Sequence, residues 1–292
     1  MDDVPPSPLP RERVAALLTT LGVSGDVRAM RAELDELAAL VTETRPIAAV
    51  EDVELALTHR VVRLRTYADR PGPLPDLVWF HGGGFISGTL DAIDPVCREL
   101  AARAPVRVVS VDYRLAPEHP FPAALEDALA VVAELRPAAV GGDSAGGNLA
   151  AAVAQEHRDL AAQVLLCPLL DCTLTTRSLQ EKSDGYGLTA EALKAFVLLY
   201  AGTADVRDPR LSPLLAADVV GVPPAVVVTA EHDPLRDDGE EYAARLRAAG
   251  VATRVRRWDA QLHGFPGLTA ETPDALDALQ WAADGLAELL AA

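Results

Sequence analysis

The sequence predicts an α/β fold in which a mainly parallel β-sheet is covered by helices on both faces. Short apolar runs predict strands at residues 61–67, 77–80, 106–111, 138–141, 164–166, 225–229 and 253–258. Segments with apolar residues at helical spacing lie between most of these runs, at residues 91–104, 122–135, 145–157, 235–249 and 273–290. No helix separates the first two strands, which predicts an antiparallel start. A weaker candidate at residues 48–57 brings the expected number of strands to eight.

The composition excludes several classes of function. Half of the 292 residues are hydrophobic, and the formal net charge of −17 repels phosphate backbones and anionic lipid surfaces. The N-terminus lacks the pattern of a secretory signal, and no apolar run approaches the roughly 20 residues of a membrane span. We therefore expect a cytoplasmic protein without nucleic-acid or membrane partners. No disulfide framework and no metal site is expected from the three cysteines, Cys97, Cys167 and Cys172.

Two segments interrupt the alternation of strands and helices. Helical spacing at about residues 11–44 predicts two helices within residues 1–45. Residues 172–208 make a long connection that contains a helix from about 190 to 200, with Thr189 as its N-cap. We interpret both segments as a helical cap over a core formed by residues 46–171 and 209–292.

A G-x-S-x-G pattern lies between a predicted strand and a predicted helix. The run G-D-S-A-G spans residues 142–146 and places Ser144 between Gly142 and Gly146. A nucleophile on such a sharp turn needs neighbours without bulk, and the turn exposes its hydroxyl at a helix N-terminus. Ser144 is therefore the candidate nucleophile.

A second glycine cluster follows the strand at residues 77–80, with the run H-G-G-G-F. Acyl transfer requires preorganised N–H donors for an oxyanion, and we expect these from Gly82 and Gly83 together with Ala145. A phosphate loop is the alternative, but the G-K-[ST] ending is absent. His81 is expected to brace the loop.

The serine needs a base and an orienting acid. His232 and His263 follow the last two predicted strands, and His232 is adjacent to Asp233. Neighbouring side chains usually diverge, so the assignment that uses each loop once takes Asp233 as the acid and His263 as the base. Glu231 and Asp237 are the competing acids.

The chain resembles the hormone-sensitive-lipase-like α/β-hydrolases, in the branch of bacterial esterases with H-G-G-G-F and G-D-S-A-G-G motifs. The resemblance runs from about residue 60 to residue 266. Besides the two motifs, it rests on D-Y-R-L-A-P-E at residues 112–118, on C-P at 167–168, on L-S-P-L at 211–214, on H-D-P-L-R-D at 232–237 and on H-G-F at 263–265.

The resemblance implies an α/β-hydrolase fold and cofactor-free hydrolysis of short- to medium-chain carboxylic esters. Carried over by position, it implies a triad of Ser144, Asp233 and His263 and oxyanion donors Gly82, Gly83 and Ala145. It also implies that Glu118 and Asp143 brace the elbow and the glycine loop. Two residues depart from the family pattern: Ala260 stands where Gly is frequent, and Asp238 where Glu is frequent.

Other functions remain open on the same fold. An amide-, formamide- or lactone-cleaving enzyme would use the same triad, because fold and triad do not determine the substrate. A non-catalytic binder is disfavoured, since His263 is present in its expected loop. The expected partners are a small ester and water, and the sequence allows a homodimer. Candidate pocket residues are Phe85, Leu188, Phe196 and Leu214.

Overall fold

The computed structural model describes residues 31–32, 44–58 and 60–292, and these contain one eight-stranded sheet. The strand order is β1-β2-β4-β3-β5-β6-β7-β8. The bounds are β1 Ala49–Ala56, β2 Val61–Ala68, β3 Asp76–Phe80, β4 Arg107–Val111, β5 Ala139–Asp143, β6 Ala162–Leu166, β7 Ala225–His232 and β8 Thr253–Leu262. The α/β-hydrolase fold predicted from the sequence is confirmed.

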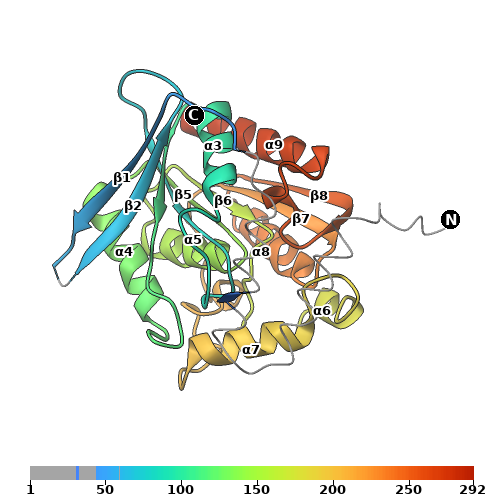
Figure 1. Ribbon diagram of the computed structural model, residues 1–292. Helices are drawn as coiled ribbons and strands as arrows, with labels where there is room; N and C mark the ends of the chain where they lie inside the picture. Colours follow the sequence, from blue (N-terminus) through green and yellow to red (C-terminus); the bar gives the residue numbers. More distant parts are fainter. Residues whose placement is uncertain (1–30, 33–43, 59) are drawn as a thin grey trace.

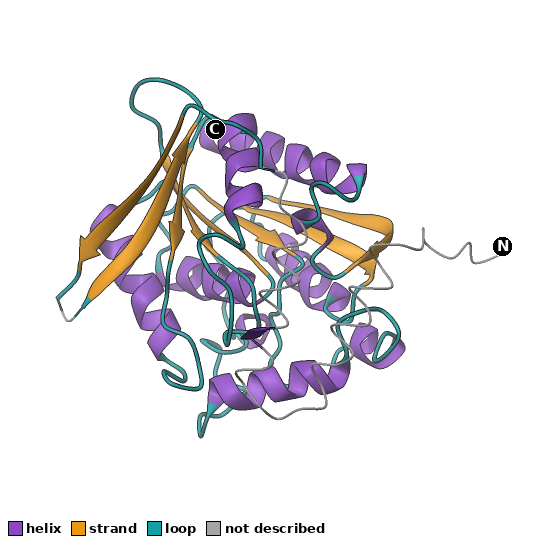
Figure 2. Cartoon of the chain, viewed as in Figure 1, coloured by secondary structure: helices purple, strands orange, loops and turns teal. Residues whose placement is uncertain are grey.

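The sheet begins antiparallel and continues parallel (Figure 2). β1 pairs with β2 and β2 pairs with β4 in antiparallel register. Every later pair, from β3 with β4 to β7 with β8, is parallel. The predicted antiparallel start is therefore correct, and the weak candidate at residues 48–57 is a strand.

Helices cover both faces of the sheet (Figure 1). Helices α3 (Asp94–Arg103) and α9 (Pro273–Leu290) pack together over one apolar cluster, which includes Trp79. Helices α4 (Ala123–Leu135), α5 (Ala145–Glu156) and α8 (Arg236–Ala248) cover the opposite face, where Phe80 is buried. Successive residues of β3 thus point into opposite cores, as the period of a strand requires.

The strands bring the candidate residues to one edge of the sheet. Parallel strands end at the same edge, and open α/β sheets bind ligands there. The glycine loop follows β3, Ser144 follows β5, Asp233 follows β7 and His263 follows β8. The order of strands therefore gathers residues that are up to 182 positions apart (263 minus 81) in the sequence.

Residues 172–208, which we call the cap segment, lie within the connection between β6 and β7 and contain helices α6 (Arg177–Glu181) and α7 (Ala190–Ala201). The N-cap of α7 is Thr189, whose hydroxyl accepts the Ala192 N–H at 3.1 Å. The sequence indicated α7 and missed the short α6. The two helices expected within residues 1–45 lie almost entirely outside the described residues.

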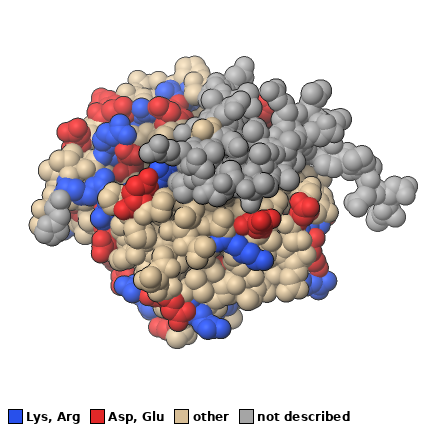
Figure 3. Space-filling view, turned by 60° about the horizontal axis from the view of Figure 1, so that its bottom comes forward, with Lys and Arg blue, Asp and Glu red and all other residues tan. Residues whose placement is uncertain are grey.

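The side of the molecule that carries α7 has few charged groups among its described residues. Figure 3 shows a broad uncharged surface there, with acidic and basic side chains interspersed around it. Within the described part of the chain, no helix is both long and apolar enough to cross a membrane.

Candidate active site

Ser144 occupies a strained turn between β5 and α5. Its φ of 52° and ψ of −117° lie in a region that residues with side chains rarely adopt. The turn is tight because a Cβ on Gly142 would overlap the Gly146 backbone, and a Cβ on Gly146 would overlap the carbonyl of Phe80. The two glycines of the pattern are thus required by contact, as the sequence predicted.

The hydroxyl of Ser144 lies 2.9 Å from Nε2 of His263, and Nδ1 of the same ring lies 2.9 Å from Oδ2 of Asp233. The Asp233 carboxylate is fully buried, and its other oxygen accepts the Leu235 N–H at 2.7 Å. Burial alone would lower the pKa of His263, but the Asp233 carboxylate outweighs it and raises the pKa above its ordinary value. The imidazole is therefore oriented and made more basic by Asp233.

The competing acids are engaged elsewhere. Glu231 accepts the Ala260 N–H at 2.7 Å, and Asp237 accepts the Ser178 N–H at 2.7 Å. The ring of His232 stacks on that of Tyr186, with 5.1 Å between centroids. These contacts leave Asp233 and His263 as the pair that meets Ser144.

The glycine loop differs from the sequence prediction at Gly82. The Gly82 N–H donates to Oδ2 of Asp143 at 3.0 Å and is thus not available to an oxyanion. Its assignment as an oxyanion donor is wrong, because a buried carboxylate already uses its one N–H. The N–H groups of Gly83 and Gly84 have no hydrogen-bond partner among the described residues.

Asp143 joins the elbow to the glycine loop, which is the contact that the resemblance implied. Its other oxygen accepts the Trp79 Nε1–H at 3.3 Å. Burial raises the pKa of Asp143 to about 6, although the hydrogen bonds from Trp79 and Gly82 favour the ionised form. A bridge of this kind fixes the distance between the two loops.

His81 braces the loop, as predicted. Its Nδ1 lies 2.7 Å from the carbonyl of Gly82, and its ring stacks on Tyr113 at 4.3 Å. The Tyr113 hydroxyl donates to the His81 carbonyl at 2.6 Å. Burial lowers the pKa of His81, so the ring is neutral in its brace.

Glu118 has a different place from the one the resemblance implied. Its carboxylate binds the guanidinium of Arg31 at 2.8 and 2.5 Å and contacts neither the elbow nor the glycine loop directly. Arg31 also donates to the carbonyls of Ile86 and Ala116. The hydrogen bond from Arg31 holds the pKa of Glu118 down at about 2. Glu118 is therefore connected through Arg31 to Ile86, the residue just after the glycine loop.

A cavity of about 240 Å³ opens above Ser144 and His263. Leu188 and Phe196 of the cap segment line it, as predicted. Phe85 and Leu214 do not, and for them the prediction is wrong because both side chains belong to the buried core. The sequence also missed further apolar lining residues, which come from α7, from the start of α3 and from the loop after β8: Leu193, Ile93, Pro95, Val96, Pro266 and Leu268.

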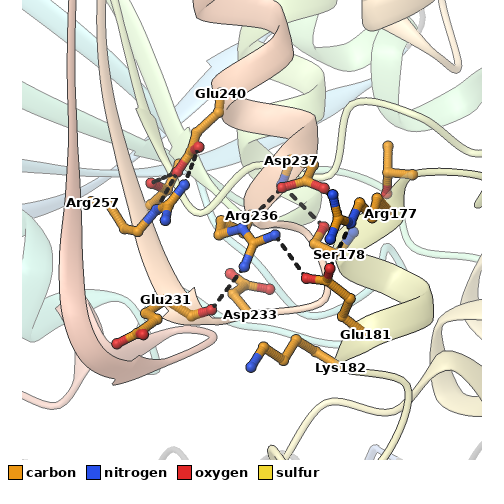
Figure 4. A network of polar contacts seen from close by, with 12 residues as sticks. Arg177, Ser178, Glu181, Lys182, Glu231, Asp233, Arg236, Asp237, Glu240 and Arg257 are labelled. Carbon is orange, nitrogen blue, oxygen red and sulfur yellow. Dashed lines mark hydrogen bonds and ion pairs between the residues drawn. The ribbon is translucent and has the colours of Figure 1, made fainter. Parts of the chain in front are cut away.

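A polar network joins α6 to the loop that carries Asp233 (Figure 4). The Ser178 hydroxyl donates to the carbonyl of Pro234 at 2.8 Å and accepts the Asp237 N–H at 3.1 Å. Arg236 lies between Asp237 at 2.9 Å and Glu181 at 3.2 Å. The short helix thus anchors the residues next to Asp233. In the described residues, no group of three His, Cys, Asp or Glu side chains is arranged to hold a metal ion.

Comparison with known proteins agrees with this geometry. A family described as alpha/beta hydrolase fold matches residues 77–267. The carboxylic ester hydrolase LipN of Mycobacterium tuberculosis is 40% identical over 274 residues, which cover 85% of this chain and 72% of LipN. The carboxylesterase NlhH of the same organism is 42% identical over 225 residues, 70% of each protein.

A solved structure is also similar over nearly the whole chain. The ester-hydrolase EH1AB1 from the metagenome of Lake Arreo, complexed with a derivative of bipyridine phosphonate, matches with a TM-score of 0.90 at 34% identity. The match covers 97% of this chain and 99% of that one. The chain belongs to the α/β-hydrolase family. Within that family it is a member of the hormone-sensitive-lipase-like esterase branch.

Proposed function

We propose that this protein hydrolyses short- to medium-chain carboxylic esters through an acyl-enzyme intermediate on Ser144. The observation that carries the proposal is the pair of 2.9 Å contacts from Ser144 through His263 to Asp233, at the floor of an apolar cavity. The names of the relatives LipN and NlhH support the ester as substrate.

The geometry suits two successive acyl transfers. Nε2 of His263 accepts the Ser144 proton as the hydroxyl oxygen attacks the ester carbonyl, and Asp233 stabilises the imidazolium that forms. The oxyanion accepts hydrogen bonds from the N–H groups of Gly83, Gly84 and Ala145, where Gly84 replaces the Gly82 of the sequence prediction. His263 then protonates the leaving alcohol, and a water activated by His263 releases the acid.

The cavity size favours short acyl chains. Its 240 Å³ is below the roughly 300–1,000 Å³ of pockets that enclose drug-sized ligands. With p-nitrophenyl esters, kcat/KM should be highest between acetate and hexanoate and should fall for decanoate. A maximum of kcat/KM at decanoate would contradict the preference for short acyl chains. Faster cleavage of the anilides with the same acyl groups would favour an amidase.

Replacement of the nucleophile tests the proposal directly. Ser144→Ala should lower kcat for p-nitrophenyl butyrate by roughly 10⁶-fold, because the covalent step is lost. Ser183→Ala, at an exposed serine of the cap segment, is the matched control and should keep full activity. Substantial turnover by Ser144→Ala, with the fold intact by circular dichroism, would overturn the assignment.

A further inference from the structure

Three consecutive residues of the glycine loop have positive φ, and the last two are Gly84 and Phe85. The φ of Gly84 is 60° and that of Phe85 is 64°. Glycine adopts this conformation freely, whereas a residue with a Cβ loses roughly 1–2 kcal/mol. A strained residue persists only where its surroundings hold it in place. Phe85 therefore requires an anchor.

Helix α7 provides an anchor for the Phe85 side chain. The ring of Phe85 is fully buried and stacks on the ring of Tyr200, with 3.7 Å between centroids and 9° between planes. Phe121 packs edge-on against the same tyrosine at 5.9 Å, and its N–H donates to the Tyr200 carbonyl at 2.7 Å. Phe121 thus holds Tyr200 in place, and the ring of Tyr200 packs on Phe85.

The same face of α7 contacts the preceding residue of the loop. Phe196 is one turn before Tyr200, so the two rings lie on one side of the helix. A Cβ added to Gly84 would lie only 2.7 Å from the Phe196 ring. Phe196 and Tyr200 therefore pack on two consecutive left-handed residues, Gly84 and Phe85.

We infer that Tyr200 is a positioning residue of the oxyanion loop, an inference that rests on the ester hydrolysis proposed above. Its ring holds Phe85 in the left-handed conformation and thereby sets the direction of the Gly84 N–H. Tyr200 does not line the cavity, so it acts without touching the substrate. Its hydroxyl is buried and has no hydrogen-bond partner among the described residues, so the ring carries this role.

Two substitutions at Tyr200 separate the ring from the hydroxyl. Tyr200→Leu removes the stacking and should lower kcat for p-nitrophenyl butyrate about tenfold or more, because a displaced donor stabilises the oxyanion less. KM should change less than about twofold, since ground-state contacts are kept. Tyr200→Phe keeps the ring and should retain kcat within about twofold. Active sites are counted with a p-nitrophenyl phosphonate, so that kcat refers to folded enzyme.

The pH profile and a helix control exclude a general loss of structure. The acid limb of kcat/KM should stay unchanged in Tyr200→Leu, because the hydrogen bonds of His263 are to Ser144 and Asp233. The Asp143 carboxylate, which also favours the charged ring, is held by Gly82 and Trp79 and not by Phe85. Leu198→Ala, at a side chain of the same helix that is 71% exposed, should keep full activity. The inference would be overturned if Tyr200→Leu kept full kcat, or if Tyr200→Phe lost as much kcat as Tyr200→Leu. It would also be overturned if Tyr200→Leu raised KM and left kcat unchanged.

A double-mutant cycle tests the contact itself, and the single variant Phe85→Leu serves as the test if Tyr200→Leu fails to fold. Phe85→Leu removes the partner ring and should reproduce the loss of kcat. The double variant should lose no more than either single variant, because both act through one contact. Multiplied losses would overturn the inference. Turnover by Ser144→Ala would instead reject the proposed function, so the two failures are distinguishable.

Discussion

The two helices of the cap segment contact two loops of the active site by different kinds of interaction. Helix α7 packs aromatic rings on Gly84 and Phe85, whereas α6 binds the Asp233 loop through Ser178 and the ion pairs of Arg236. The glycine loop holds a strained backbone, and a packed ring resists its relaxation. The acid loop holds a buried charge, and directional hydrogen bonds determine where that charge lies.

The contacts of these two loops can be compared with those of a third one, the loop that carries His263. It follows β8, and a register shift between β7 and β8 lies near Ala230 and His232. Near the end of β8, the Ala260 N–H donates to Glu231, which belongs to β7 and not to the cap segment. In the part of the chain that the structure describes, the approach to the His263 loop is therefore supported by the core at Glu231, whereas the other two loops have contacts with the cap segment.

The largest effect is expected when the buried charge of Asp233 is removed. Asp233→Asn should lower kcat by roughly 10⁴-fold, because the imidazole loses both its orientation and its stabilising charge. Asp233 raises the pKa of His263, and the base works deprotonated, so wild-type activity rises with pH through a raised pKa. In Asp233→Asn the acid limb of kcat/KM should move to lower pH.

A charge change in the cap segment is the control for this experiment. Asp184 is exposed, and Asp184→Asn should leave both kcat and the acid limb unchanged. An acid limb at the same pH in Asp233→Asn as in the wild type would show that another group sets the basicity of His263.

A smaller effect is expected from loosening the α6 network. Arg236 is 13% exposed and pairs with both Glu181 and Asp237, so Arg236→Leu should lower the free energy of unfolding by roughly 1–3 kcal/mol. The kcat should fall severalfold, because the loop next to Asp233 loses an anchor. Urea unfolding and ester kinetics on the same preparations measure both quantities.

Arg177 gives a matched comparison, since it pairs with the same Glu181 but is 82% exposed. Arg177→Leu should change the free energy of unfolding by less than about 0.5 kcal/mol, as exposed pairs contribute little. Equal losses in the two variants would mean that α6 stabilises the fold through Glu181 alone. The contrast between polar contacts of α6 and aromatic contacts of α7 would then not explain how the two loops are held.

Local patterns were sufficient for the sheet and for the elbow at Ser144. The strands and the elbow at Ser144 follow from apolar periodicity and from glycines that a tight turn demands. Asp233 and His263 could be assigned because parallel strands end at one edge. The sequence missed α6, since that helix has only five residues and is held by polar contacts with the distant α8.

The errors share one physical cause, because each depends on a contact between segments far apart in the sequence. Gly82 was assigned wrongly since its N–H direction depends on Asp143, 61 residues away. Phe85 was placed in the pocket because an apolar residue beside the glycine loop fits both places, and only its stacking on Tyr200 distinguishes them. Leu214 was also placed in the pocket, but its side chain is buried in the apolar core.

The smallest expected effect concerns the end of β8, which leads into the His263 loop. Ala260 has a φ of 55°, which explains why the related family often has glycine there. Ala260→Gly relieves roughly 1–2 kcal/mol of strain, and the added freedom of the unfolded chain offsets part of this. The free energy of unfolding should rise by about 0.5 kcal/mol in urea titrations followed by tryptophan fluorescence, with kcat unchanged. Because neither α6 nor α7 provides the partner of Ala260, this gain should add to the loss in Arg236→Leu. A gain that disappears in the double variant would show that the cap segment also governs the His263 loop.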